Sequence, residues 1–286
     1  MNCHEEQIEL NGYSLQRYIF CPSAPEPIRG AAVLFHGQGD FSERYGEVLQ
    51  PFISKGIACV ATDLPGHGRS EGARGHVPGL EIVDRIAEVS HQRCQELCND
   101  NPAPPGILGH SAGGLLVLRE LLRRPGSWSY SWISSPLLHP AANQHPLLVR
   151  LTPLASRLLP RFTVATGVTQ DRCTSQPECL RKEGGPDLFH SRVSTLWGHV
   201  LIRAARWVGE HFRNSPPRVP LLITQGLRDR ICSALHLRAL LTEVSPSRLT
   251  LREFPEALHE PFFDECREDV SSEITNWLER ESIIGL

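Results

Sequence analysis

The sequence predicts an α/β protein with a mostly parallel central sheet flanked by helices. Short apolar runs typical of buried strands alternate with segments of helical periodicity. Loops rich in turn residues follow directly after several of these runs, and the alternating order of strands and helices favours a parallel sheet. From residue 137 to residue 216 the pattern changes, because no run there has the character of a buried strand. We therefore expect a helical segment inserted after the sixth strand.

The first half of the chain is expected to form six strands. Residues 8–20 alternate apolar and polar side chains around Asn11-Gly12, which is a strong hairpin signal. Four further strands are expected at 31–35, 57–62, 107–108 and 129–135, and helices at 42–54, 79–98 and 112–124. Ligands of such sheets bind at the carboxyl ends of the strands.

The second half of the chain is expected to divide into an insertion and a return to the sheet. Helices are predicted at 145–159, 194–212, 233–244 and 269–280, and strands at 219–224 and 248–254. We predict a core of residues 1–136 and 217–286 and a helical cap of residues 137–216. Most leucines and tryptophans of the cap should pack it onto the core, and some should line an apolar channel. One face of its first helix carries Leu147, Leu151, Leu154 and Leu158.

Composition excludes several classes of protein. The chain has 286 residues and a formal net charge of -3 without a block of lysine or arginine, which argues against a nucleic-acid partner. Its start is polar and acidic, so no secretory signal is visible, and no apolar run approaches the roughly 18 residues of a membrane span. The apolar face of residues 147–159 is compatible with peripheral membrane contact, although core packing explains it equally well.

Nine cysteines are scattered without C-x-x-C spacing, which is typical of reduced thiols in a cytoplasmic protein. A disulfide or a metal at Cys94 and Cys98, or at Cys173 and Cys179, is disfavoured by the same reasoning. No metal and no cofactor is expected.

The stretch from Gly109 to Gly113 fits the G-x-S-x-G nucleophile elbow, with Ser111 as the nucleophile. The spacing has a steric reason. The serine occupies a strained turn between a strand and a helix, and larger side chains two residues away would collide with the neighbouring backbone. An apolar strand before the motif and a leucine-rich helix after it provide this context.

A serine hydroxyl needs a base and an orienting acid, which follow it in the order acid, histidine in sheets that carry this elbow. After the last predicted strands only His236 and His259 remain. His236 lies within a predicted helix, whereas His259 directly follows a strand, so we predict His259 as the general base. Asp229 lies just past a predicted strand end and is the predicted acid, with Glu253 and Asp187 in reserve.

Two backbone N–H groups must stabilise the oxyanion. One belongs to the residue after the nucleophile, Ala112, and the other to the loop after the early strand, where we select Gln38.

These motifs carry a resemblance to a known family. Five segments occur in the family's order, namely FHGQG at 35–39, DLPGHGRSEG at 63–72, GHSAGG at 109–114, QGLRDR at 225–230 and LHEP at 258–261. The chain resembles α/β-hydrolases of the monoacylglycerol lipase and lysophospholipase group, also called the serine aminopeptidase S33-like group. The resemblance is weakest from about residue 136 to residue 217. Family members often have methionine where this chain has Ala112, a difference that concerns only side-chain packing.

The resemblance implies a cofactor-free serine hydrolase that cleaves small, lipid-like fatty acyl esters through an acyl-enzyme. It also implies Ser111, Asp229 and His259 as the triad, with Gln38 and Ala112 as oxyanion donors. Acyl length, head group and oligomeric state are left open.

The sequence also leaves two alternatives to an esterase open. An aminopeptidase would need an acidic side chain in the cap to hold the substrate amine, and Glu178, Glu183 or Asp187 could serve. A non-catalytic binding module on the same fold is the other alternative, against which the complete set of triad residues argues. Ser111 excludes the carboxylate nucleophile of epoxide hydrolases and dehalogenases.

Overall fold

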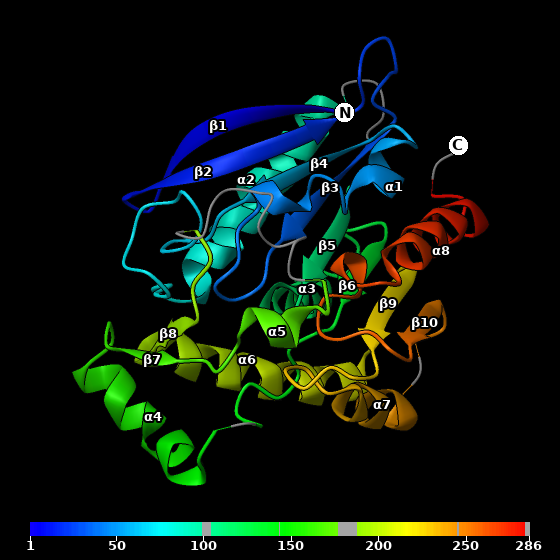
Figure 1. The fold of residues 1–286 in the computed structure, drawn as a ribbon. Helices are drawn as coiled ribbons and strands as arrows, with labels where there is room; N and C mark the ends of the chain where they lie inside the picture. The colour runs from blue at the N-terminus through cyan, green and yellow to red at the C-terminus, as the bar shows by residue number, and fades with distance from the viewer. Residues whose placement is uncertain (99–103, 143, 177–187, 245, 284–286) are drawn as a thin grey trace.

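The computed structural model describes residues 1–98, 104–142, 144–176, 188–244 and 246–283. An eight-stranded sheet has the order β1-β2-β4-β3-β5-β6-β9-β10 (Figure 1). The strands are β1 (Asn2–Leu10), β2 (Tyr13–Cys21), β3 (Gly30–Phe35), β4 (Ile57–Thr62), β5 (Gly106–His110), β6 (Ser131–Ser134), β9 (Leu221–Gly226) and β10 (Leu249–Phe254). Every pair from β4 to β10 is parallel, while β1 and β2 form an antiparallel edge. The predicted, mostly parallel sheet is confirmed.

The edge hairpin turns at Asn11 and Gly12, which have φ values of 51° and 79°. Asparagine and glycine tolerate positive φ at the two central positions of such a turn. The predicted hairpin is therefore confirmed, and its strands extend further than the alternation of residues 8–20 indicated.

Helices cover both faces of the sheet. One face packs against α2 (Leu80–Leu97), α3 (Ala112–Arg123) and α7 (Ala234–Glu243), and the other against α1 (Gln50–Ile53) and α8 (Arg267–Arg280). The single helix predicted at 42–54 is wrong, because the structure has a 3-10 turn at Glu43–Tyr45 and only one α-helical turn at α1. Pro51 lies in the first turn of α1, where it costs no hydrogen bond; within one continuous helix it would remove one.

The segment between β6 and β9 contains α4 (Pro146–Leu158), β7 (Thr163–Ala165), α5 (Gln170–Cys173), β8 (Arg192–Ser194) and α6 (Thr195–Asn214). Its helical character agrees with the prediction, but the short antiparallel ribbon of β7 and β8 was not anticipated. The buried face of α6 joins the core and packs on α3. The division into a core of 1–136 and 217–286 and a cap of 137–216 stays a prediction.

The leucines of α4 do not pack onto the core. Leu147, Leu151, Leu154 and Leu158 are between 46% and 69% exposed, so the expectation of core packing is wrong for this helix. The reason is the order of the layers, since α4 packs on α6 and α6 packs on α3 (Figure 1). On α6, by contrast, Trp197 and Leu201 are buried as expected. Among the residues described, no helix combines the length and the apolar character needed to cross a bilayer.

Candidate active site

Ser111 occupies the turn between β5 and α3 with φ 53° and ψ -117°, a conformation that non-glycine residues rarely adopt. The flanking glycines are required by contact. A Cβ on Gly113 would collide with the carbonyl oxygen of Phe35, and one on Gly109 would lie 2.7 Å from the backbone of Gly113. The steric account of the G-x-S-x-G spacing is thus confirmed.

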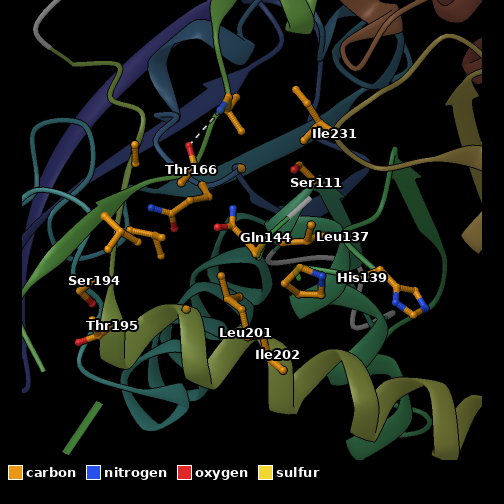
Figure 2. A pocket seen from close by; sticks show the side chains of 18 of the residues that line it. Ser111, Leu137, His139, Gln144, Thr166, Ser194, Thr195, Leu201, Ile202 and Ile231 are labelled. Carbon is orange, nitrogen blue, oxygen red and sulfur yellow. Dashed lines mark hydrogen bonds between the residues drawn. The ribbon is translucent and has the colours of Figure 1, made fainter. Parts of the chain in front are cut away.

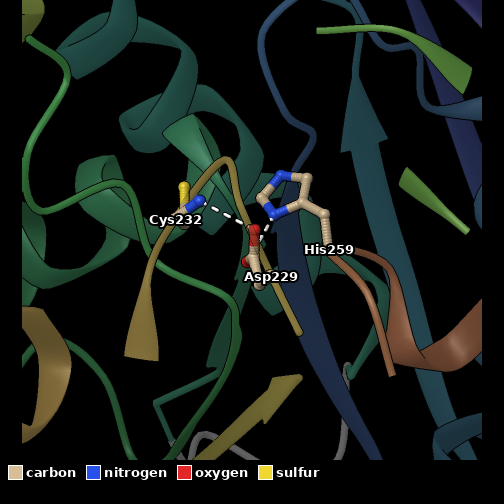
Figure 3. A group of neighbouring side chains, drawn as sticks. All are labelled: Asp229, Cys232 and His259. Carbon is tan, nitrogen blue, oxygen red and sulfur yellow. Dashed lines mark hydrogen bonds and ion pairs between the residues drawn. The ribbon is translucent and has the colours of Figure 1, made fainter. Parts of the chain in front are cut away.

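Asp229 and His259 meet at the same edge of the sheet, in the loops after β9 and β10 (Figure 3). The Nδ1 of His259 lies 2.8 Å from the Oδ2 of Asp229, and both residues are buried. The other carboxylate oxygen accepts the backbone N–H groups of Ile231 and Cys232 at 2.7 and 2.8 Å. The amide of Gln225 donates to Oδ2 at 3.2 Å. These bonds fix the carboxylate in the orientation in which it can hold the imidazole.

The hydroxyl of Ser111 lies in the same pocket as His259. Its Oγ faces the Sγ of Cys232 at 3.9 Å. The structure therefore gathers the three side chains that the sequence selected, Ser111, Asp229 and His259, from loops 118 and 30 residues apart.

The pKa values of the two histidines at the site, His259 and His110, are shifted in opposite directions. Burial lowers the pKa of His259, but the charge of Asp229 and its hydrogen bond outweigh burial and raise the pKa above 6.5. Burial, reinforced by the charge of His259, holds the pKa of His110 well below that value. The two rings are 4.6 Å apart between centroids. Of the two rings, His259 is therefore the one that takes up a proton more readily.

A buried ion network lies beside His259. Arg44 donates to both oxygens of Glu260, at 3.0 and 2.8 Å, and to Asp40 at 2.9 Å. Tyr45 donates its hydroxyl to Asp40 at 2.6 Å. Burial raises the pKa of Asp40, but Arg44 and the hydrogen bond from Tyr45 outweigh it and lower the pKa to about 2. The network joins the loop after β3 to the loop that carries His259.

Sequence analysis missed this network. Asp40 and Arg44 have the (i, i+4) spacing of an ion pair, and Glu260 adjoins the predicted base, so both signals were present. Neither signal indicates that residues 44 and 260 meet.

The loop after β3 lies against the elbow. A Cβ on Gly37 would be 3.3 Å from the Cβ of Ser111. Gln38 lines the pocket, and Ala112 is the first residue of α3, where a helix leaves its N–H without an intrahelical partner. Ala112 thus adjoins Ser111 in the chain, and Gln38 follows the loop residue that lies against Ser111; their role as oxyanion donors stays a prediction.

Other candidates from the sequence lie elsewhere. Glu253, a reserve acid, pairs with Arg238 at 2.7 Å, and His236 packs against His139. Asp187, Glu178 and Glu183 lie outside the described residues, as does Cys179. The eight cysteines that the structure does describe, Cys94 and Cys98 included, are free thiols.

One group of described side chains has the spacing of metal ligands. Asp229, Cys232 and His259 offer ligand atoms within 4.8 Å of one another. The carboxylate and Nδ1 of the imidazole are already joined by a hydrogen bond, and the backbone donors fill the other carboxylate oxygen.

A pocket of about 470 Å³ opens beside Ser111 (Figure 2). Ser111 and His259 lie at its base with Gln38, while apolar side chains of α4, α6 and β7 form much of the remaining wall. These apolar lining residues include Leu148, Leu151, Leu159, Val164, Leu201 and Ile202. The predicted apolar channel to Ser111 is confirmed.

A serine on a tight strand-to-helix turn and an Asp–His pair at the carboxyl edge of one parallel sheet define an α/β-hydrolase. Comparison with known proteins agrees. The family model described as serine aminopeptidase, S33, matches residues 26–266, and the chain belongs to this family.

Several relatives that match most of the chain are lipases. A monoacylglycerol lipase of Mycolicibacterium smegmatis is 29% identical over 252 residues, which cover 87% of this chain and 88% of that protein. Monoglyceride lipase of Rattus norvegicus is 28% identical, covering 92% and 87%. The crystal structure of Paleococcus ferrophilus monoacylglycerol lipase superposes with a TM-score of 0.83 at 29% identity, covering 94% of this chain and 99% of the other.

Proposed function

We propose that this carboxylic ester hydrolase cleaves fatty acyl esters of the monoacylglycerol or lysophospholipid type, through an acyl-enzyme on Ser111. The observation that carries the proposal is the pocket, in which Ser111 and His259 stand beneath a largely apolar wall. Such a wall suits an acyl chain, and the polar base suits the ester group. The names of the relatives point to the same substrates.

The proposed reaction uses three side chains. His259 accepts the proton of Ser111 through Nε2 while Oγ attacks the ester carbonyl, and Asp229 holds Nδ1–H and stabilises the imidazolium. His259 then gives the proton to the leaving alcohol. Water, activated by the same imidazole, releases the fatty acid and restores Ser111.

The oxyanion of each tetrahedral intermediate would accept the backbone N–H groups of Gln38 and Ala112. Removing one such donor typically costs about 3 kcal/mol of transition-state stabilisation.

Attack also requires Ser111 to leave its contact with Cys232. Hydrogen bonds of catalytic groups are often long in a free enzyme and tighten when substrate binds. The proposal therefore includes a substrate-bound state in which Oγ bonds to His259 instead of facing the thiol at 3.9 Å.

The exposed leucines of α4 support a second part of the proposal, namely that the cap touches the lipid surface from which substrate is drawn. Leu147, Leu154 and Leu158 are 57%, 57% and 69% exposed, and the pocket wall does not include them. A cluster of exposed leucines beside a pocket mouth is typical of a lipid contact.

The test is a comparison of wild type with Ser111→Ala on p-nitrophenyl esters of increasing acyl length and on monoacylglycerols. We expect hydrolysis to fall on the order of 10⁶-fold with folding retained, because the nucleophile is lost. Ser90→Ala, which alters a buried serine of α2, should keep wild-type activity. A fluorophosphonate should label wild type and Ser90→Ala but not Ser111→Ala.

Two results would contradict the proposal. Hydrolysis by Ser111→Ala at the wild-type rate would contradict an acyl-enzyme on Ser111. Preference for aminoacyl-nitroanilides over acyl esters would favour the aminopeptidase alternative.

A further inference from the structure

The side chain of Gln38 reaches out of the loop after β3 into the segment 190–197. Its Nε2 donates to the carbonyl oxygen of Arg192 at 2.8 Å. Its Oε1 accepts the indole N–H of Trp197, also at 2.8 Å. Both ends of one amide are therefore held by a segment more than 150 residues away in sequence.

The next residue of the same loop is held by the same segment. The backbone N–H of His190 donates to the carbonyl oxygen of Gly39 at 2.9 Å. Gly39 has φ 77°, and a Cβ there would collide with the carbonyl oxygen of His190. Residues 190–197 thus hold the loop by hydrogen bonds at two consecutive positions, Gln38 and Gly39.

The gripping segment is itself fixed to the core. Trp197 is fully buried, and its backbone N–H is capped by the hydroxyl of Ser194 at 3.1 Å. Ser194 in turn donates its N–H to the carbonyl oxygen of Gly75 at 2.9 Å, and its hydroxyl lies 2.9 Å from Nδ1 of His76. A contact made to Trp197 is therefore a contact to a rigid support.

The loop that carries Gln38 lies against the proposed nucleophile, because Gly37 packs directly against Ser111. The N–H that would bind the oxyanion belongs to Gln38 itself, so the side chain and the donor share one Cα. An oxyanion donor is effective only when held within about 0.5 Å of its place. A shift of the Gln38 side chain would move the donor.

We infer that Trp197 and the carbonyl of Arg192 position the oxyanion hole, by holding the side chain of Gln38. Trp197 is then a positioning residue, and the start of α6, whose Thr195, Gly198 and Leu201 line the pocket, helps to set the rate as well as the shape of the site. The inference rests on the proposed function.

The alternative is that the amide merely satisfies a buried indole N–H, as buried polar groups generally require. The two accounts differ in what they predict. A hydrogen bond that only satisfies the buried indole N–H of Trp197 would contribute to the stability of the fold and not to kcat. Positioning of an oxyanion donor contributes to kcat, because the oxyanion exists only on the reaction path.

The experiment compares Trp197→Phe, Gln38→Met and the double variant with wild type, using one p-nitrophenyl ester. We expect Trp197→Phe to lower kcat about tenfold, the effect of one hydrogen bond, and Gln38→Met, which removes both bonds of the amide, to lower it at least as much, with KM within about twofold in each. The double variant should be no slower than the slower single variant, since both remove the same link. The rate of fluorophosphonate labelling should fall in parallel.

Trp207→Phe is the matched control, because Trp207 lies on the same helix and packs on His211 instead. It should keep the wild-type kcat, and thermal unfolding reports the stability of all four variants. Wild-type kcat in Trp197→Phe and Gln38→Met, whatever their melting temperatures, would overturn the inference, and so would additive losses in the double variant. Neither result would contradict the proposed function, which is tested separately by Ser111→Ala and by the choice between acyl esters and aminoacyl-nitroanilides.

Discussion

Two regions face each other across the pocket and are built in opposite ways. At the base, the side chains of Ser111, Asp229 and His259 are each less than 10% exposed. On the opposite wall, α4 contributes Leu148 and Leu151, which are 58% and 46% exposed. The base is held by hydrogen bonds to the backbone and by buried ion pairs, whereas α4 rests on one other helix.

The difference indicates that catalysis and substrate binding place different demands on the two regions. Chemistry needs side chains held in one geometry, and loops at the edge of a packed sheet can supply that rigidity. The proposed acyl chain would need apolar surface more than exact geometry, and α4 offers such a surface without being part of the core. Changes at the base should therefore alter rate and stability steeply, and changes to leucines of α4 outside the pocket wall should alter neither.

The largest effect is expected from Asp229→Asn. This change should lower kcat on the order of 10⁴-fold, because the amide no longer holds His259 in the required tautomer. In wild type the proposed base, His259, can accept a proton only when neutral, and its pKa is raised, so kcat/KM should rise with pH through a midpoint above 6.5. Without the charge of Asp229 that midpoint should move to lower pH.

A pH–rate profile of both proteins makes this measurement. Asp84→Asn is the control, because Asp84 belongs to α2 and pairs with Arg123 at 2.8 Å, and it should leave the profile unchanged. A midpoint that stays in place in Asp229→Asn would show that another group sets the pKa of His259.

A smaller but still large effect is expected from Arg44→Met. The change leaves the carboxylates of Asp40 and Glu260 buried without their cation and should lower the free energy of unfolding by about 3–5 kcal/mol. The pKa of Asp40 is lowered in the folded state, so its contribution is present above its unfolded pKa of 3.8 and is lost as pH falls toward 2. The difference between the two proteins should therefore shrink over that range.

Urea unfolding of both proteins across pH tests this expectation. Arg69→Met serves for comparison, since the Arg69–Glu43 pair is partly exposed and its loss should cost less than about 1 kcal/mol. Equal losses in the two variants would mean that the buried network does not stabilise the base of the pocket.

The smallest effect on the enzyme itself is expected from the double variant Leu154→Ser with Leu158→Ser. Both side chains lie outside the pocket wall, so stability should change by less than about 1 kcal/mol and hydrolysis of a short p-nitrophenyl ester should not change. Sedimentation with phosphatidylcholine vesicles should show at least about tenfold weaker binding, because two leucines are lost from the lipid contact.

Leu151→Ser provides the contrast within the same helix. Leu151 lines the pocket, so this variant should shift the preference toward shorter acyl chains. Unchanged vesicle binding in the double variant would contradict the proposed lipid contact of α4.

Residues that act through local geometry were predictable from the sequence. The elbow around Ser111 and the hairpin at Asn11 depend on backbone conformations that few residues adopt. Asp229 and His259 could be selected because parallel strands bring the loops after them to one edge of the sheet. In each case the residue's own neighbours in the chain carried the information.

Contacts between distant parts of the chain were decided by the tertiary structure alone. Arg44 and Glu260 are 216 residues apart, and Gln38 and Trp197 are 159 apart. Their side chains are ordinary in their local sequence, and only packing makes them partners. Likewise the leucine pattern of residues 145–159 defines an apolar face but not its neighbour, because burial depends on which layer α6 occupies. Periodicity and motif spacing predicted the sheet and the proposed triad residues. The ion network beside His259 and the hydrogen bonds that hold the loop at Gln38 depend on long-range packing instead.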